Sequence, residues 1–267
     1  MLIVCNGMAR SGSTLQYNLV RSLVERRGLG YGHGSFSGHQ LGENLELIFE
    51  FAQDTEFHII KTHDWLDWIA DLVRNGQASL LYSYRDIRDV SVSLRQMFGH
   101  DDDSLTKALD KAIDVYYRVL GLEGSFIQRY EDLTHDLQQS VVDLGSCLDI
   151  AVTENEARVI SIEFSIDAIA KRVGKKSMKT RVGNVLLKLL SRMEVPYLAR
   201  VMGVPQEWRQ RVAVSLKGYN FNDQFYPGHI SETHGASVWR DKLSKDEARK
   251  LTDRYGNWLR DAGYDQI

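Results

Sequence analysis

Met1-Leu-Ile-Val-Cys-Asn-Gly-Met-Ala-Arg-Ser-Gly-Ser-Thr14 is the stretch that decides the fold class of this chain. Its apolar run Leu2–Cys5 predicts a buried strand, and the leucines that begin at Leu15 follow at helical spacing. A strand, a turn that contains glycine and the start of a helix together form a common anion site. The first turn of a helix carries unpaired N–H groups and the positive end of the helix dipole, so we expect a phosphate-like ligand here.

The turn between this strand and helix carries the groups that such an anion needs. Gly12 lets the backbone approach the ligand, while Ser13 and Thr14 add hydroxyl groups. Arg10 adds a charge that is permanent at neutral pH. Ser13 and Thr14 are also typical helix caps, and that structural interpretation stays open. A Walker A loop is excluded, because that motif needs four residues between its glycines and a Gly-Lys-Ser/Thr ending.

The first half of the chain alternates short apolar runs with helical patterns. Further strands are predicted at Phe57–Ile60, Ser79–Tyr84 and Ser125–Arg129. The helical patterns span Thr14–Arg26, Gly42–Gln53, Asp64–Asn75, Val90–Phe98, Leu105–Leu120 and Leu133–Leu148. This alternation predicts an α/β fold with a central parallel sheet flanked by helices, in which ligands lie beyond the carboxyl ends of the strands.

The second half differs in composition. We expect one domain over residues 1–267, with a helical insertion or lid within it at 169–226. The basic stretch at 171–181 fits either a lid or a solvated helix face, and both interpretations stay open. The chain then predicts an amphipathic helix over 243–264, with Ser244 as its N-cap and Glu247 completing a capping box.

Composition excludes several classes of protein. The net charge of -3 gives no sign of a nucleic-acid partner. The two cysteines, Cys5 and Cys147, are expected to be free thiols of a reducing compartment. No apolar run approaches the ~18 residues of a membrane span, and Met1 leads directly into a strand rather than a signal peptide. A cytoplasmic location is therefore expected.

Five stretches together resemble the sulfotransferases that use 3′-phosphoadenosine 5′-phosphosulfate (PAPS). They are Arg10–Thr14, Ile60–His63, Tyr84–Ser93, Arg129–Leu133 and His234–Arg240. Each is a weak motif alone, but they occur in the order of the family and run from one end of the chain to the other. Two departures are Leu15, where the family often has an aromatic residue, and His234, which precedes Gly235 where a basic pair is usual.

The resemblance implies a P-loop NTPase-like sulfotransferase fold, PAPS as cofactor and no metal. It also implies three catalytic residues. His63 is the general base, Arg10 stabilises the leaving group and Lys61 complements the sulfate charge. The residues implied to hold the nucleotide are Arg10, Ser11, Gly12, Ser13, Thr14, Arg85, Ser93, Tyr130, His234, Gly235, Ala236, Ser237, Trp239 and Arg240.

The 3′-phosphate contact has a structural alternative. Arg85 ends a strand and Ser93 lies in the next helix, so both can face one phosphate. Alternatively, the arginines at 85 and 88 form surface ion pairs with Asp86 and Asp89. We favour phosphate binding for Arg85 and surface pairing for Arg88.

The expected activity is transfer of the sulfuryl group from PAPS to an acceptor hydroxyl, or less favourably to an amine. The alternatives are a P-loop-type small-molecule kinase and a nucleotide-binding module without catalysis. Contacts to the acceptor, which is a small molecule, lipid or carbohydrate, are expected from residues 28–40 and 169–226. The basic stretch 171–181 fits an anionic or carbohydrate acceptor, whereas the aromatic residues between 219 and 226 fit an apolar or aromatic one, so the sequence does not identify the acceptor. It does not indicate an oligomeric state either.

Overall fold

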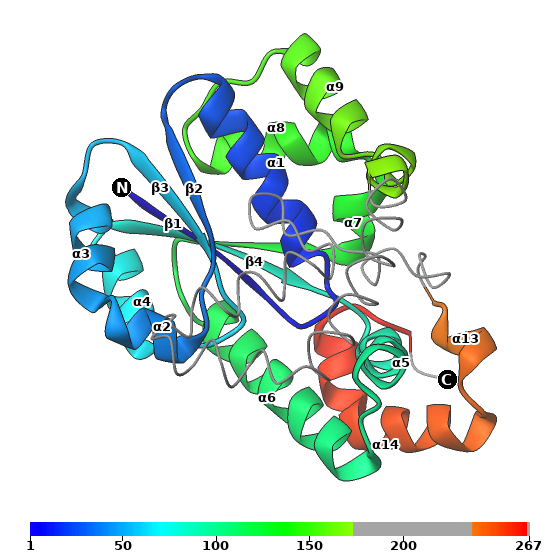
Figure 1. The fold of residues 1–267 in the computed structure, drawn as a ribbon. Coiled ribbons are helices and arrows are strands. Elements are labelled where there is room, and N and C mark those ends of the chain that lie inside the picture. Colours follow the sequence, from blue (N-terminus) through cyan, green and yellow to red (C-terminus); the bar gives the residue numbers. More distant parts are fainter. Residues whose placement is uncertain (173–236, 266–267) are drawn as a thin grey trace, which may run out of the picture. The chain divides into compact units, whose positions relative to one another are not determined.

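The computed structural model of this chain describes residues 1–172 and 237–265 (Figure 1). The chain divides into two compact units. The first consists of Met1–Ile162 and Thr233–Ile267, and the second of Glu163–Glu232. The sheet and the candidate site belong to the first unit. From residue 173 onward, the predicted insertion at 169–226 lies outside the described residues.

A five-stranded parallel sheet forms the centre of the first unit, as the sequence predicts. Its strand order is β2-β3-β1-β4-β5, so the first strand is central, with β3 on one side and β4 on the other. The strands are β1 Leu2–Gly7, β2 Gly30–Ser35, β3 Phe57–Lys61, β4 Ala78–Tyr84 and β5 Ser125–Arg129. Because β1 is buried along its whole length, its apolar run carries no alternation.

The edge strand β2 corrects the sequence-based description of residues 28–40. No strand was predicted there, but Gly30–Ser35 pairs in parallel with β3. Glycine occupies every second position of β2, so neither an apolar run nor an alternating pattern marks it in the sequence. The α2 helix starts directly afterwards, where Ser37 forms a capping box with Gln40.

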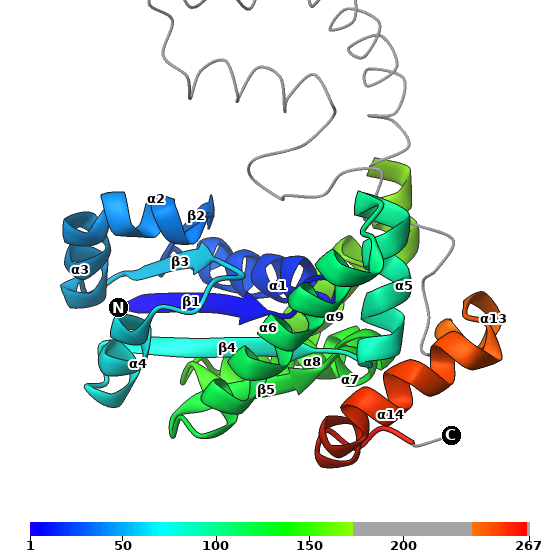
Figure 2. The same ribbon diagram turned by 90° about the horizontal axis from the view of Figure 1, so that it is seen from below.

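Helices cover both faces of the sheet. Leu2 and Val4 of β1 belong to a core cluster that includes residues of α3, α4, α6 and α14, while α1 lies over the other face together with α8 (Figures 1 and 2). The helices are α1 Ser13–Arg26, α2 Gly38–Glu43, α3 Leu45–Gln53, α4 Asp67–Arg74, α5 Ile87–Phe98, α6 Asp102–Leu120, α7 Tyr130–His135, α8 Leu137–Cys147, α9 Glu154–Glu163, α13 Trp239–Lys242 and α14 Lys245–Asp261. None of the helices in this described part of the chain has the length and apolarity that a bilayer-spanning segment needs.

Local capping signals decide where the helices begin. The predicted capping box of Ser244 and Glu247 is confirmed at the start of α14. The single helix predicted over 133–148 is instead two helices, because the side chain of Asp136 accepts a hydrogen bond from Gln139 N and caps α8. Both cysteines are free thiols, as expected, but only Cys5 is fully buried.

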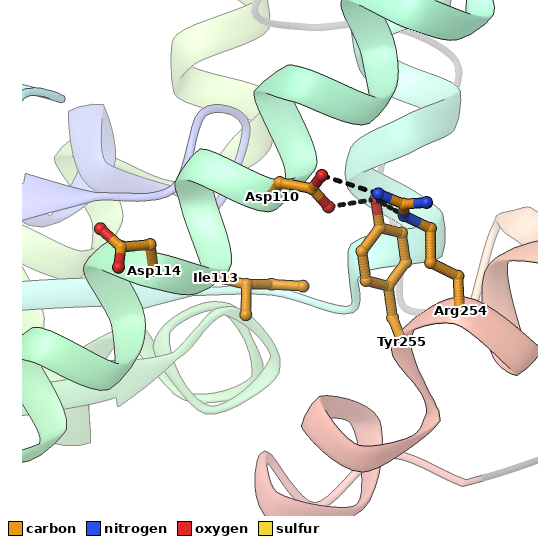
Figure 3. A pocket seen from close by; sticks show the side chains of 5 residues that line it. All are labelled: Asp110, Ile113, Asp114, Arg254 and Tyr255. Atoms are coloured by element: carbon orange, nitrogen blue, oxygen red, sulfur yellow. Dashed lines mark hydrogen bonds and ion pairs between the residues drawn. The ribbon is translucent and has the colours of Figure 1, made fainter.

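The C-terminal helix is fixed to α6 by a polar cluster (Figure 3). Asp110 Oδ2 accepts from Arg254 Nη2 at 2.8 Å, and Asp110 Oδ1 accepts from the hydroxyl of Tyr255 at 2.9 Å. These residues line a pocket of about 400 Å³ together with Ile113 and Asp114. None of the residues proposed for catalysis or nucleotide binding lines it, so we assign this cluster to helix docking.

Candidate active site

The carboxyl ends of the strands bring the predicted site residues to one edge of the sheet. All five strands are parallel, and Figure 2 shows β1 and β3 running in the same direction toward α5. The loop after β1 therefore lies between the end of β3, which leads to Lys61–His63, and the end of β4, which leads to Arg85.

A tight turn shapes the loop between β1 and α1. The N–H of Ser11 donates to Met8 O at 3.2 Å, and Arg10 occupies the third position of this turn with a φ of 69°. A left-handed conformation is uncommon for arginine and costs of order 1 kcal/mol. The buried Ser11 hydroxyl lies 2.7 Å from Met8 O and 2.8 Å from Ser83 O. This side chain therefore ties the loop to β4 rather than facing a ligand.

Gly12 leaves the start of α1 accessible to a ligand. It is the N-cap of the helix with a φ of 88°, and no side chain accepts a hydrogen bond from the first N–H groups in the described structure. A Cβ atom at this position would lie 2.9 Å from Leu133 Cδ2 and 3.1 Å from Tyr130 Cδ2. Capping by Ser13 or Thr14 is therefore not what the structure shows, and the helix N-terminus retains its capacity for an anion.

Arg10 joins this loop to α5. Its Nε donates to Ser93 Oγ at 2.7 Å, although the two residues are 83 positions apart in the sequence. Arg85 also reaches the loop, through a long hydrogen bond of 3.5 Å from Nη1 to Arg10 O. The groups predicted for the 5′ and 3′ ends of the nucleotide thus form one connected cluster.

His63 is held on both of its ring nitrogens. Nδ1 lies 2.8 Å from Gly7 O and Nε2 lies 2.9 Å from Lys61 Nζ. A carbonyl oxygen can only accept, so Nδ1 carries the proton and Nε2 accepts from the lysine ammonium. Burial of the ring, and then the charge of Lys61, lower the pKa of His63 below its usual 6.5. The residue as a whole nevertheless stays exposed, so neutral His63 can meet a substrate.

Lys61 is buried at the end of β3. Only 4% of its surface is exposed, and loss of hydration lowers its pKa from 10.5 to about 8. The ammonium is therefore charged at neutral pH, although its solvation is poor. An anion bound beside it would restore part of the lost stabilisation.

Arg85 lies in a buried environment of aromatic and acidic groups. Its guanidinium is 4.3 Å from the ring centroid of Tyr130, and its Nη2 donates to Asp89 Oδ2 at 3.3 Å. Tyr130 therefore lies against both Gly12 and Arg85, between the two halves of the predicted nucleotide site. The ion pair that was the structural alternative for Arg85 exists, with Asp89 as its partner, but it is buried rather than on the surface.

Arg88 corrects the prediction of a surface ion pair. It does pair with Asp86, at 2.7 Å, but only 1% of the arginine is exposed. Its guanidinium also donates to Asp265 O at 2.9 Å and stacks 4.0 Å from the ring centroid of Trp239. Helical spacing alone could not reveal these partners, because they come from the far end of the chain.

The C-terminal segment meets α5 at the same place. Ser237 N and Trp239 N donate to the two carboxylate oxygens of Asp89, at 3.0 and 2.8 Å. Trp239 is buried, whereas the exposed Arg240 has its guanidinium 4.5 Å from the ring centroid of Trp239. The other predicted residues of this segment, His234, Gly235 and Ala236, lie outside the described residues.

Asp89 and Gly7 were not among the predicted site residues. Asp89 lies four residues before Ser93, on the same side of α5, and four residues after Arg85, and this spacing was the available signal. The carbonyl of Gly7 orients His63. No side-chain pattern could have indicated a main-chain acceptor.

One group of potential metal ligands occurs among the described residues. Asp54, Glu56 and His58 have ligand atoms within 4.8 Å of one another. They lie at the start of β3, at the end of this strand opposite to His63. His58 already bonds Asp54 at 2.9 Å and His33 at 2.9 Å, so hydrogen bonding accounts for the arrangement.

Comparison with known proteins identifies the fold. No protein-family model and no curated protein matches the sequence. Solved structures do match. Retinol dehydratase in a complex with retinol and PAP gives a TM-score of 0.54 at 13% identity, covering 97% of this chain and 81% of that one. The same enzyme with androsterone and inactive cofactor PAP gives 0.53 at 15%, covering 97% and 80%.

A third structure is mouse sulfotransferase SULT7A1 complexed with PAP. Its TM-score is 0.56 at 12% identity, and the match covers 97% of this chain and 84% of that one. The chain described here therefore has the sulfotransferase fold, as the resemblance in the sequence implied. At these identities the likeness concerns the fold alone.

Proposed function

We propose that this protein is a PAPS-dependent sulfotransferase that transfers the sulfuryl group to an acceptor hydroxyl and releases adenosine 3′,5′-bisphosphate (PAP). One observation carries the proposal. Arg10, just before the uncapped start of α1, bonds Ser93 on α5 and is contacted by Arg85, while the buried Lys61 and the exposed His63 lie at the carboxyl end of the neighbouring strand β3. Anion-binding groups and a base candidate thus converge at one sheet edge.

The 5′ phosphosulfate fits the start of α1. The first N–H groups of α1 have no side-chain cap in the described structure, because the N-cap residue is Gly12. Arg10 supplies a permanent charge near the oxygen that leaves with the phosphate. It therefore stabilises developing negative charge rather than donating a proton.

The 3′ phosphate fits Arg85 and Ser93. Ser93 Oγ accepts from Arg10 through a lone pair, which leaves the hydroxyl proton to be donated to a phosphate oxygen. One hydroxyl can thus link the 3′ phosphate to the arginine that acts at the 5′ end. Tyr130 lies beside this site against Arg85, and we include it, with the 237–240 segment, in the nucleotide site.

His63 acts as the general base in this proposal. PAPS supplies the sulfuryl group, so that sulfur bonds the acceptor oxygen as its bond to the phosphate oxygen breaks. His63 Nε2 takes the proton of the acceptor hydroxyl, after exchanging its hydrogen bond from Lys61 for one from that hydroxyl. Lys61 can then turn its charge toward the sulfate, and Gly7 O keeps the imidazole in the required tautomer.

The acceptor side of the site begins next to His63. Phe36 N donates to Lys61 O at 2.8 Å, and Gly38 N donates to Asp64 Oδ2 at 2.7 Å, so the end of β2 and the start of α2 are fixed there. We propose a small-molecule, lipid or carbohydrate hydroxyl as acceptor. Retinol and androsterone in the structures of retinol dehydratase support a small organic molecule. A single sulfotransferase domain over residues 1–267, with a helical insertion at 169–226, remains our proposal for the domain organisation.

Acceptor-dependent release of PAP tests this function. We expect the purified chain to release PAP from PAPS when supplied with a panel of sterol, retinoid, phenol and sugar alcohols. H63A should abolish release while binding PAP within about twofold of wild type. Binding of PAP with no turnover on any acceptor would indicate a nucleotide-binding module, and turnover of ATP-Mg²⁺ instead would indicate a kinase.

The two free thiols support a cytoplasmic location for this reaction.

A further inference from the structure

Asp89 is a carboxylate that contacts both sides of the proposed 3′-phosphate site. Its side chain is 0% exposed. Oδ2 accepts from Arg85 Nη2 at 3.3 Å and from Ser237 N at 3.0 Å, while Oδ1 accepts from Trp239 N at 2.8 Å. One buried carboxylate thus holds a candidate phosphate ligand and the backbone of the C-terminal segment.

The location of this charge calls for a physical reason. A buried carboxylate loses its hydration, and near a phosphate it also repels the ligand. Burial raises the pKa of Asp89, while the Arg85 charge and the two backbone N–H groups oppose that shift. A neutral side chain would avoid these costs. The charge is favourable here because it orients donors that the ligand needs.

Arg85 is oriented by this contact. Asp89 holds Nη2, whereas Nη1 reaches Arg10 O at 3.5 Å and the guanidinium plane lies against Tyr130. The arginine is therefore aligned between α5 and the loop that precedes α1. Ser93, one helical turn further along α5, lies on the same side as Asp89.

The backbone at Ser237 is shaped for the second contact. Its φ of 64° is left-handed, and this turn brings the N–H groups of residues 237 and 239 to the same carboxylate. Trp239 is then buried against Arg88, at the start of α13. Without Asp89, the buried N–H of Trp239 and the partly buried N–H of Ser237 would both lose their acceptor.

We propose that Asp89 is a positioning residue for 3′-phosphate recognition, which aligns Arg85 and holds the segment 237–240 on α5 so that both sides of the site form together. This inference rests on the proposed function. Its specific consequence is that loss of the Asp89 charge weakens recognition of the 3′ phosphate and leaves recognition of the 5′ phosphate intact.

Titration calorimetry of the full chain with PAP and with AMP tests this inference, because the ratio of their Kd values measures the contribution of the 3′ phosphate. We define the ratio as the Kd for AMP divided by the Kd for PAP. We expect D89N to lower it at least tenfold, because the Kd for PAP rises while the Kd for AMP is unchanged. D86N is the matched control. Asp86, the N-cap of α5, is also buried and also paired with an arginine, but its partner is Arg88. D86N should change the ratio less than threefold.

Each other outcome overturns a defined part of the account. A wild-type ratio in D89N would remove Asp89 from 3′-phosphate recognition. An equal loss in D86N would mean that any weakening of the start of α5 has this effect. If the wild-type protein itself binds PAP and AMP equally, the proposed function fails, and the role of Asp89 fails with it.

The wild-type protein offers a second test in case D89N does not fold. Hydrogen exchange of the Ser237 and Trp239 amides should slow at least threefold with PAP relative to AMP, since a bound 3′ phosphate stabilises the arrangement that holds both amides. Equal exchange with the two nucleotides would contradict the proposal.

Discussion

Arg10 and Ser93 are joined by a hydrogen bond of 2.7 Å between Nε and Oγ, across 83 positions of sequence. The contact connects the turn before α1 with the second turn of α5. Two sequence motifs that are each weak alone, Arg10–Thr14 and Tyr84–Ser93, therefore meet in one candidate site. Arg10 makes this contact from a left-handed backbone conformation with a φ of 69°, which is strained for a residue other than glycine. Strain of this kind persists where the surrounding structure enforces it, often at functional sites.

Replacing Arg10 should separate stability from activity. Glycine adopts the left-handed conformation without strain, so R10G should keep its free energy of unfolding within about 1 kcal/mol of wild type. Sulfuryl transfer should nevertheless fall about 10²–10³-fold in kcat, because a charge at the leaving group is lost. R10A is the matched control, with equal loss of activity and lower stability than R10G in urea unfolding. Wild-type kcat in R10G would remove Arg10 from catalysis.

The pH profile of kcat/KM should be shifted at its acid limb. The pKa of His63 lies below its usual 6.5, because of burial first and Lys61 second. Neutral His63 therefore persists to lower pH, and activity should stay level on going from pH 7.5 to 6. Activity should fall as the pH rises through about 8, where buried Lys61 loses its charge. An acid limb with its midpoint at 6.5 or above would contradict this description of His63.

Stability should rise with pH in the range where Lys61 titrates. Folding lowers the pKa of Lys61 from 10.5 to about 8 through burial, so between these values the unfolded chain binds more protons than the folded one. The free energy of unfolding therefore increases with pH in this window. The gain should reach roughly 1–2 kcal/mol between pH 8 and 9.5, at 1.4 kcal/mol per pH unit at most.

K61M provides the control for that measurement. The methionine side chain is of similar length and does not titrate, so the unfolding free energy of wild type should rise relative to that of K61M by roughly 1–2 kcal/mol as the pH goes from 8 to 9.5. Urea unfolding at three pH values in this range is sufficient. A difference that stays constant with pH would show that Lys61 has an ordinary pKa.

Gly12 and Gly76 form a matched pair for testing the α1 loop. Both have a positive φ, 88° and 68°, but a Cβ at Gly12 meets Leu133 and Tyr130 whereas a Cβ at Gly76 meets nothing within 4 Å. G76A should cost about 1 kcal/mol of stability and leave PAP binding unchanged. G12A should cost about 2–4 kcal/mol and weaken PAP at least tenfold, measured by urea unfolding and calorimetry. Equal effects of the two variants would remove the special role of Gly12.

The parts of the fold that the sequence predicts are those set by local patterns. The run Leu2–Cys5 predicts a buried strand, and Ser244 with Glu247 predicts the start of a helix, because in each case the deciding residues lie close together in the sequence. The strand Gly30–Ser35 was not predicted, since its alternating glycines erase the apolar pattern and its pairing with β3 is tertiary.

In the candidate site, too, local sequence patterns could be interpreted in advance, whereas contacts between distant segments could not. His63, Lys61 and Arg10 were predicted from motifs that follow predicted strands and resemble those of the sulfotransferases, and their roles stay predictions. The burial of Arg88 could not be predicted, because it depends on Trp239 and Asp265, which are about 150 or more positions away. Asp89 was first interpreted as a surface partner, and only the main-chain N–H groups of residues 237 and 239 reveal what it holds.

Calorimetric titration of the purified wild-type protein with PAP, with AMP and ATP-Mg²⁺ as separate controls, tests the central claim most directly. A 3′ phosphate held by Arg85 and Ser93 through charge-assisted hydrogen bonds is worth roughly 1.5–3 kcal/mol, so PAP should bind at least tenfold more tightly than AMP. It should also bind more tightly than ATP-Mg²⁺. Preference for ATP-Mg²⁺, or no binding of PAP, would contradict the assignment of this sheet edge as a PAPS site.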